Sequence, residues 1–199
     1  MAETIPTAEE LELEDRVIRV DRVRKTVKGG RIPSSRVVAA VGDRRGHVGL
    51  GVAKARQAPD AIRKAIDRAR KNMIRVPLDG YTIPHQVQCK VGGAIILLRP
   101  ASRGTGLIAG GPVRALAELA GVRDVLSKSL GSSNTLNRAK AAFECLKQLM
   151  NPREVSQARG RGLRDMLGRD FEDPYAAQEA ASAREAAPEE EEAEEDEEE

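Results

Sequence analysis

The stretch KTVKGGRIPSSR, from Lys25 to Arg36, separates two segments in which apolar residues recur at nearly every second position. Such alternation is typical of half-buried β-strands, so RVIRVDRVRK and RVVAAVGD predict two strands. The paired glycines between these segments suit a turn. The stretch holds four cations and neither an acid nor an aromatic residue, so its charges repel one another. We therefore predict a hairpin whose loop needs an external partner of negative charge.

The charges of the chain are segregated along its length. The 199 residues carry 33 Lys and Arg against 31 Asp and Glu, a formal net charge of only +2. Residues 16–76, however, contain 18 cations and four acids, whereas residues 1–15 contain six acids and no base. The last eleven residues, EEEEAEEDEEE, contain ten acids. A basic body with acidic ends is typical of proteins that bind polyanions.

The first basic unit, residues 16–76, is expected to form three strands followed by a helix. The turn GDRRG has hairpin chemistry and introduces a third strand-like segment, HVGLGVAKA. In the following APDAIRKAIDRARKNMI, a proline and an aspartate suit a first helical turn. Apolar residues at helical spacing are expected to pack on the sheet, and these are Ile62, Ile66, Ala69 and Met73.

The second unit, residues 77–165, is predicted to have the order ββαβα. Strands are predicted for TIPHQVQCKV and AIILLRP, and helices for PVRALAELAG and SSNTLNRAKAAFECLKQLM. The segment VRDVLSKSL favours a strand, although a helix is an open alternative. The fold class is therefore α+β. Residues 1–15 and 166–199 are expected to form a disordered acidic arm and tail, because such sequences bury too little apolar surface to fold.

The cations of the first unit are the candidate binding residues, and several basic elements in one small domain predict one broad surface that neutralises phosphates. Aromatic residues, which stack on unpaired bases, make up only 2% of the chain. This scarcity favours recognition of folded RNA by its shape and backbone. A free-standing protein that binds double-stranded RNA or DNA would use the same residues, and this alternative stays open. The candidates are Arg24, Lys25, Lys28, Gly29, Gly30, Arg31, Arg36, Arg44, Arg45, Lys54, Arg56, Arg63, Lys64, Arg68 and Lys71.

The glycine-rich segment SRGTGLIAGG precedes a predicted helix, as the phosphate-binding loops of nucleotide enzymes do. Its spacing is GxGxxxG and it lacks the GK[ST] ending of a P-loop, so a kinase-like function is not expected. The histidines, His47 and His85, and the cysteines, Cys89 and Cys145, have no metal-ligand spacing. We predict a protein that is not an enzyme and uses no cofactor, metal or small-molecule substrate.

Three further patterns favour a cytoplasmic location. No apolar run approaches the roughly 20 residues that a membrane span requires, and the N-terminus has no apolar segment of the kind found in signal peptides. The two cysteines form no CxxC pair, and we expect them to be reduced thiols packed in the interior.

Long motifs of this chain resemble the bacterial family of ribosomal protein five of the small subunit. VDRVRKTVKGGR, VVAAVGDRRGHVGLGVAKA and APDAIRKAIDRARKNM are similar to its N-terminal domain, and LLRPASRGTGLIAGGPVRALAELAGVRDVLSKSLGSSN to its C-terminal domain. The resemblance implies a first domain like the double-stranded-RNA-binding fold and a second with a left-handed βαβ crossover. It also implies binding of small-subunit rRNA and of ribosomal proteins four and eight of that subunit. The position implied lies beside the path by which mRNA enters, where the family affects decoding accuracy.

The resemblance also implies roles for particular residues. The loop from Lys28 to Arg31 matches the family's rRNA-inserting finger, near the site where spectinomycin acts. The segment Gly104, Thr105 and Gly106 through Arg114 matches the region that contacts protein four. Two features depart from the family pattern: the acidic tail, and IPSSR after the finger, where family members usually carry an aromatic-containing stretch. Because proline lacks a backbone donor, IPSSR is expected to shorten or bend the second strand.

Overall fold

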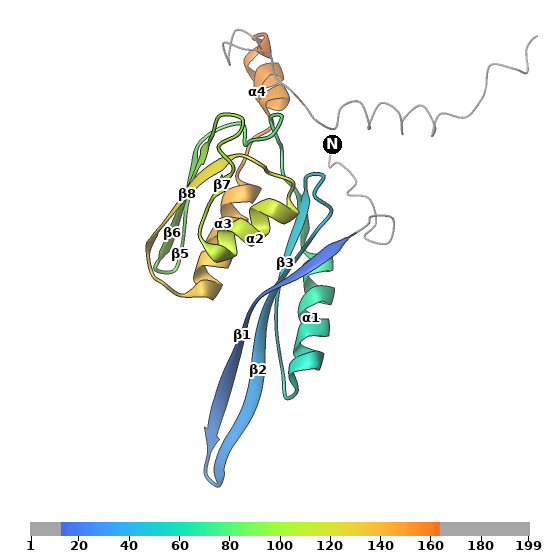
Figure 1. Cartoon of the computed structure of the whole chain (residues 1–199), viewed down its shortest axis with the longest axis vertical. Coiled ribbons are helices and arrows are strands. Elements are labelled where there is room, and N and C mark those ends of the chain that lie inside the picture. The colour runs from blue at the N-terminus through green and yellow to red at the C-terminus, as the bar shows by residue number, and fades with distance from the viewer. Residues whose placement is uncertain (1–12, 164–199) are drawn as a thin grey trace, which may run out of the picture.

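The computed structural model describes residues 13–163, which form two four-stranded sheets and four helices (Figure 1). The elements stack in four layers. Helix α1 covers one face of the first sheet, helices α2 and α3 lie between the two sheets, and the second sheet is the outermost layer on the other side. The α+β class expected from the sequence is confirmed. Most of the expected acidic arm and tail lies outside the described residues.

The first sheet has the strand order β1-β2-β3-β4, and all its pairs are antiparallel. Its three long strands confirm the predicted strands. Strand β1 nevertheless starts earlier than expected, because Glu14 and Asp15, assigned to the acidic arm, pair with Gly42 and Val41. The fourth strand was not predicted. The strands are β1 (Glu14–Val27), β2 (Gly30–Gly42), β3 (His47–Ala55) and β4 (Met73–Arg75).

Helix α1 (Ala58–Lys71) begins with Pro59 and Asp60 in its first turn, as predicted, and Ala69 of the predicted stripe is buried, but the centre of the packing face is shifted toward alanines. Its fully buried residues are Ala61, Ala65 and Ala69, while Ile62 and Ile66 are only half-buried. Met73, expected on the same stripe, lies beyond the helix in β4. The helix approaches β3 so closely that only the smallest side chains fit between them.

Glycines on β3 make this close approach possible. A Cβ atom added to Gly51 would lie 2.6 Å from the backbone nitrogen of Ala69 and still closer to the carbonyl oxygen of Ala65. One added to Gly49 would overlap the Ala69 carbonyl group. The sheet therefore offers the helix a backbone surface, against which the alanines are fully buried and Ile62 and Ile66 only partly.

Pro33 does not shorten the second strand, so that half of the expectation is wrong. Strand β2 runs without interruption from Gly30 to Gly42, and Pro33 pairs with Arg24 of β1. Val27 and Gly30 form the hydrogen-bonded pair that closes the turn, and hydrogen-bonded and non-hydrogen-bonded pairs alternate from there. The Arg24–Pro33 pair is therefore non-hydrogen-bonded, and the backbone nitrogen of Pro33 points away from β1. Because β3 pairs with β2 only from Ser35 onward, no ladder hydrogen bond is lost on that side.

The second sheet has the order β5-β6-β8-β7, in which β7 and β8 are parallel and joined through α2. The ambiguous segment VRDVLSKSL is a strand, as the pattern favoured. Strand β7 is only two residues long and was not predicted. The elements are β5 (Val87–Val91), β6 (Ala94–Pro100), β7 (Leu107–Ile108), α2 (Gly111–Leu119), β8 (Val125–Gly131), α3 (Thr135–Lys147) and α4 (Pro152–Arg159).

One continuous apolar core joins the two units. Val38 and Val48 of the first sheet belong to the same buried cluster as Leu116 of α2 and Leu146 of α3. The other face of the first sheet forms a smaller cluster with α1. Both sheets are thereby held in a fixed relation to each other, and the first sheet extends far beyond the shared core at one end (Figure 1).

Candidate nucleic-acid interface

The distal part of the β1–β2 hairpin projects from the body of the molecule. The pairing of β2 with β3 ends at Ser35 and Ala55, and beyond this point only β1 and β2 continue toward the turn at Lys28 and Gly29 (Figure 1). We call residues 22–35 the distal hairpin. It contains five exposed cations and no acid, and none of the five has an ion pair or hydrogen bond from its side chain to another described residue. These cations are Arg22, Arg24, Lys25, Lys28 and Arg31.

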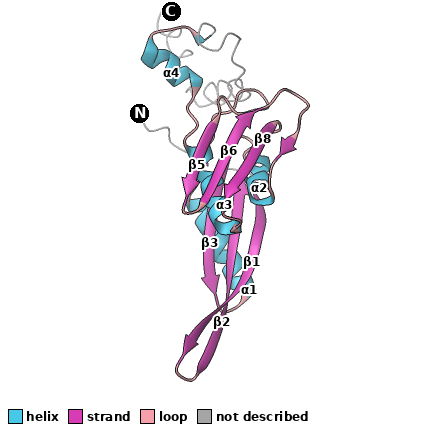
Figure 2. Cartoon of the chain, turned by 90° about the vertical axis from the view of Figure 1, so that its left-hand side faces the viewer, coloured by secondary structure: helices cyan, strands magenta, loops and turns pink. Residues whose placement is uncertain are grey.

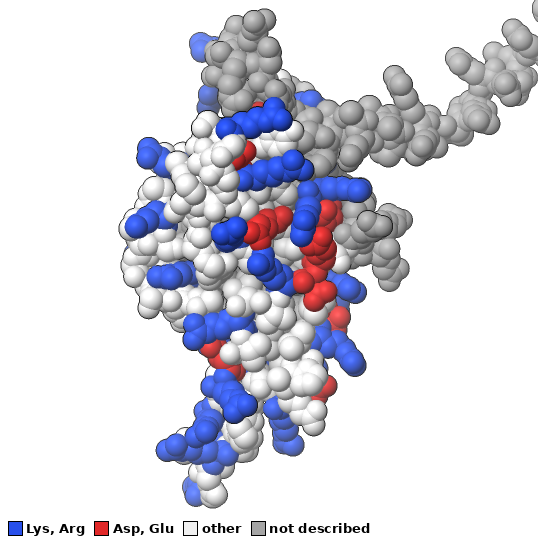
Figure 3. All heavy atoms as spheres, in the orientation of Figure 1, with Lys and Arg blue, Asp and Glu red and all other residues white. Residues whose placement is uncertain are grey.

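The two faces of the distal hairpin differ in chemistry. Directly opposed residues share a face, and the pairs Arg22–Ser35, Arg24–Pro33 and Thr26–Arg31 place three arginines on one of them. This arginine face continues into the side of the sheet that α1 covers. The opposite face carries mainly Val23, Lys25, Val27 and Ile32. Figure 3 shows Lys and Arg gathered at this end of the molecule with no acid beside them.

An ion-pair cluster closes the base of the distal hairpin. The Asp21 carboxylate accepts hydrogen bonds from Arg36 at 2.8 Å and from Arg19 at 2.6 Å, and these bonds lower the pKa of Asp21. Arg36 is half-buried, and its Nε atom is buried without a partner. Arg36 was predicted to bind RNA, but its guanidinium already has an acidic partner within the chain, which it shares with Arg19. The free positive charge therefore begins beyond Asp21.

Helix α1 starts beside the base of the distal hairpin, because the Ser35–Ala55 pair lies only three residues before Ala58. Six predicted residues of this region are exposed: Lys54, Arg56, Arg63, Lys64, Arg68 and Lys71. Arg68 also donates a hydrogen bond to the carbonyl oxygen of Val52 at 2.6 Å, which anchors the helix to β3. The structure thus brings the arginine face and the basic helix to the same side of the first sheet.

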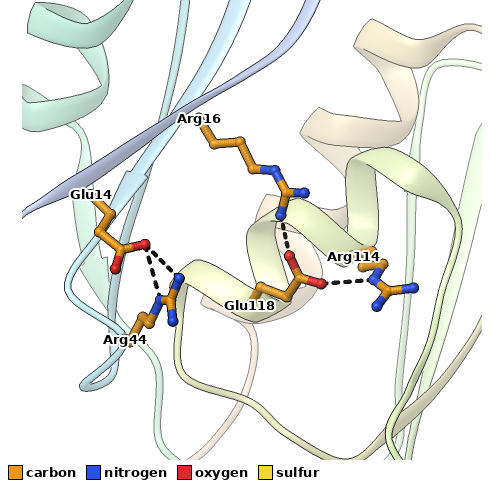
Figure 4. A network of polar contacts seen from close by, with 5 residues as sticks. All are labelled: Glu14, Arg16, Arg44, Arg114 and Glu118. Atoms are coloured by element: carbon orange, nitrogen blue, oxygen red, sulfur yellow. Dashed lines mark hydrogen bonds and ion pairs between the residues drawn. The ribbon is translucent and has the colours of Figure 1, made fainter.

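The second turn lies at the other end of the first sheet, so Arg44 and Arg45 do not belong to the surface that the distal hairpin forms. This turn follows Gly42, at the other end of β2 from the hairpin tip, about 40 Å away at roughly 3.3 Å per residue. Its backbone docks on α2, since the amide of Arg44 donates to the Leu119 carbonyl at 2.9 Å. The Arg44 side chain pairs with Glu14 at 2.7 Å (Figure 4).

The same turn is organised by a buried carboxylate. Asp43 accepts hydrogen bonds from the backbone amides of Arg45 and His47, at 2.7 and 3.0 Å, and its other oxygen contacts His47 Nδ1 at 2.6 Å. Burial by itself raises the pKa of Asp43, but the hydrogen bonds from His47 and from the two amides outweigh it and lower the pKa. His47 thus has a structural role.

Removing this carboxylate is expected to destabilise the chain in a pH-dependent way. Asp43→Ala should lower the free energy of unfolding by about 2 kcal/mol near neutral pH, because it leaves amide donors unsatisfied. Since the folded-state pKa lies below the usual value of 3.8, the stabilisation is complete above that value and is lost as the pH falls through the folded pKa. Urea denaturation of the wild type and of Asp43→Ala at about pH 7 and about pH 2.5 measures this effect. The difference between their free energies of unfolding should be smaller at the lower pH. A difference that does not change with pH would contradict this role of the carboxylate.

The glycine-rich loop after β6 has already used its backbone donors. The amides of Gly104 and Gly106 donate to Asp124 Oδ1 at 3.1 and 2.7 Å. Both glycines have positive φ, 90° and 73°, which explains their presence without any bound phosphate. Because an internal carboxylate occupies the amides that a nucleotide loop would offer, the loop does not form a phosphate cradle. Its Thr105 side chain donates to the Ser102 carbonyl at 2.8 Å.

Arg114, the other residue of the predicted protein contact, belongs to an ion-pair network between the units. Arg114 donates to Glu118 Oε1 at 2.7 Å along α2, and Arg16 of β1 contacts the other oxygen of the same carboxylate (Figure 4). Arg114 lowers the pKa of Glu118 most strongly, and Arg16 lowers it further. The structure therefore gives Arg114 a partner within the chain, while leaving its side chain more than half exposed.

Arg22 of the candidate site was not predicted, and neither was a groove between the two units that contains three cations. Arg22 completes the arginine face, and the strict pairing of β1 with β2 was the signal that could have identified it. Lys90 and Lys140, from β5 and α3, line a groove of about 740 Å³ together with Arg68 of α1. Only the packing of the two units brings these three cations together, so no local pattern could have revealed the groove.

The described residues contain no group of three or more side chains suited to hold a metal ion. Cys89 and Cys145 are free and buried, as expected, and burial raises the pKa of the Cys145 thiol. Among the helices of residues 13–163, none has the length and apolar composition needed to cross a membrane.

Comparison with protein families agrees with this geometry. Residues 13–77 match the family model "Ribosomal protein S5, N-terminal domain", and residues 89–159 match "Ribosomal protein S5, C-terminal domain". The first match contains the distal hairpin and α1, and the second contains the glycine-rich loop with α2 and α3. Together the two matches cover well over half of the chain, in the order that the resemblance implied. The chain therefore belongs to the ribosomal protein S5 family, whose members are structural, rRNA-binding proteins of the small ribosomal subunit.

Proposed function

We propose that this protein binds rRNA through the distal hairpin and α1, and that it supports accurate decoding near the path by which mRNA enters the small subunit. The observation that carries the proposal is the set of five exposed cations on residues 22–35, which have neither an acid nor an internal partner among the described residues. Such a projection is unfavourable by itself and becomes favourable when phosphates and their released counterions compensate the charge.

The same proposal assigns protein contacts to the second unit. Residues 77–152 carry nine cations and four acids, a weaker bias than that of the first unit. The exposed loop at Gly104 and the half-exposed Arg114 would contact ribosomal protein four, and ribosomal protein eight would bind the second unit as well. The rigid anchoring of the loop by Asp124 supports this assignment, because a fixed backbone loses little entropy when it binds.

Sedimentation tests the proposed function directly. In a cell lysate at moderate salt, the protein should co-migrate with small subunits on a sucrose gradient and leave them only at high salt, because phosphate contacts weaken as salt rises. Migration as a free protein at all salt concentrations, or with DNA, would contradict it. A nonsense-readthrough reporter then tests decoding: Arg114→Ala should change readthrough relative to wild type, while the protein remains in the subunits.

A further inference from the structure

The second sheet has one face that no described element covers. Helices α2 and α3 pack on its inner face, through the core that they share with the first sheet. Figure 2 looks onto the opposite face and shows β5, β6 and β8 in front of these helices. We call this opposite side the open face. As the outermost layer of the molecule, it is available to a partner.

The open face is built from side chains in strict cross-strand register. Ile95 pairs with Leu130, Leu97 with Lys128, and Arg99 with Leu126, while Ile108 of β7 lies beside Leu126. Their sequence neighbours Ile96, Leu98 and Val125 are buried on the inner face, which fixes the direction of the alternation. Five aliphatic side chains therefore share the open face: Ile95, Leu97, Ile108, Leu126 and Leu130.

Three of these five side chains are exposed, while Ile95 and Leu97 are half-buried. Ile108 is 55% exposed, Leu130 45% and Leu126 38%. Single exposed aliphatic residues are common, but a contiguous group in one register marks an interaction surface. The open face is thus an apolar patch, and a second group of exposed aliphatic residues lies on β1 and β2, at Val20, Val27 and Ile32.

The charges around the patch have one sign. Lys90, Arg99 and Lys128 stand among the aliphatic residues, and the strand positions of the open face hold no acid. Arg99 is oriented across the sheet by a hydrogen bond from its Nε atom to Gln86 Oε1 at 2.8 Å. A partner that fits this face buries aliphatic groups at its centre and presents carboxylates at its edge.

We propose that the open face is a docking surface for an acidic, apolar patch of a neighbouring protein in the small subunit. Comparison with the distal hairpin distinguishes this partner from rRNA. The hairpin groups three arginines on one face, as phosphate binding requires, whereas the open face separates its three cations by five aliphatic residues. A phosphate backbone gains little from aliphatic contacts, while a protein partner gains from burying them.

The size of the face predicts how the partner is held. Four strands about 4.8 Å apart and five residues at about 3.3 Å give a patch of roughly 14 by 17 Å. This area is well below the roughly 800 Å² per partner of a stable, independent interface. Binding is therefore expected to be weak in dilute solution and strong when rRNA holds both proteins close together. The docking surface rests on the proposed function, because rRNA binding is what brings the two proteins together.

Site-specific photo-crosslinking in small subunits tests the open face. A benzophenone amino acid replaces Lys128, in the centre of the face, or Lys64, on the exposed side of α1. The probe at position 128 should crosslink mainly to another protein, and the probe at position 64 mainly to rRNA. Adding Leu126→Glu and Leu130→Glu should reduce the protein crosslink at least fivefold, because carboxylates then face carboxylates. The matched pair Gln157→Glu and Ala158→Glu, exposed on α4, should leave it unchanged.

The outcomes separate this inference from the proposed function. Small subunits that contain the protein but yield only rRNA adducts, or no adduct, at position 128 would overturn the docking surface alone. Equal loss of the crosslink with both glutamate pairs would overturn it as well, because the effect would follow net charge and not the face. Absence of the protein from small subunits would overturn the proposed function and the docking surface together.

Discussion

Replacing Arg22, Arg24 and Arg31 with glutamine is expected to weaken binding of small-subunit rRNA by roughly 100-fold at moderate salt. The three side chains share the arginine face and are exposed, and no other described residue competes for them. A loss of about 1 kcal/mol for each phosphate contact gives about 3 kcal/mol in total, which corresponds to that factor. Glutamine keeps a polar, unbranched side chain, so the hairpin itself should remain folded.

Filter binding or fluorescence anisotropy across a series of salt concentrations measures this effect. Because each neutralised phosphate contributes about 0.7 to 0.9 units to the slope of log affinity against log salt, the triple variant should lose about two to three units. The control replaces Lys147, Arg159 and Arg161, three exposed cations of the second unit, with glutamine. It removes the same charge and should change the affinity less than about threefold. If both variants lost the same affinity, binding would depend on net charge and not on the arginine face.

Local patterns in the sequence were sufficient to predict the long elements of the fold. The near alternation on both sides of Gly29 and Gly30 predicted β1 and β2, and the segment SSNTLNRAKAAFECLKQLM predicted α3, whose Asn134 side chain accepts a hydrogen bond from the Leu136 amide. Each of these signals depends on a residue's own backbone or on neighbours within one turn. For that reason they are visible in one sequence.

Features that depend on distant segments were missed or misjudged. The alanine stripe of α1 could not be read from the helix alone, because Gly49 and Gly51 of another strand decide how closely the helix approaches. Strand β7 has two residues and forms only by pairing with β8 across the intervening α2. The effect of Pro33 was overestimated, because the sequence does not say that β3 stops pairing at Ser35.

The sequence predicted only those parts of the candidate site that depend on local composition. The tip of the hairpin was identified from its composition, and its cations are exposed and unpaired, as a binding role needs. Composition could not show that Arg36 is balanced by Asp21, or that Arg44 lies at the far end of the sheet beside Glu14. An excess of charge in a sequence indicates a candidate binding unit, whereas the pairing of each cation in the fold decides which residues are free to bind.

Gly51→Ala is expected to destabilise the protein by about 3 kcal/mol or more, although the change adds a single methyl group. The new Cβ atom would lie 2.6 Å from the Ala69 nitrogen and closer to the Ala65 carbonyl oxygen, so the clash is with backbone that cannot rotate away. Helix α1 would have to move off β3, which opens the small core of Val37, Ala39 and the helix alanines. The exposed cations of α1 would move with it, so rRNA affinity should fall together with stability.

Urea denaturation followed by circular dichroism measures the change, and Gly29→Ala is the matched control. Gly29 has no atom within 4 Å of an added Cβ and no positive φ, so alanine there should alter the free energy of unfolding by less than about 0.5 kcal/mol. The comparison isolates close approach from the general effect of replacing glycine, which restricts the unfolded chain in both variants. If Gly51→Ala were as stable as Gly29→Ala, α1 could not be seated on the backbone of β3. The surface formed by the helix and the distal hairpin would then need a different geometry.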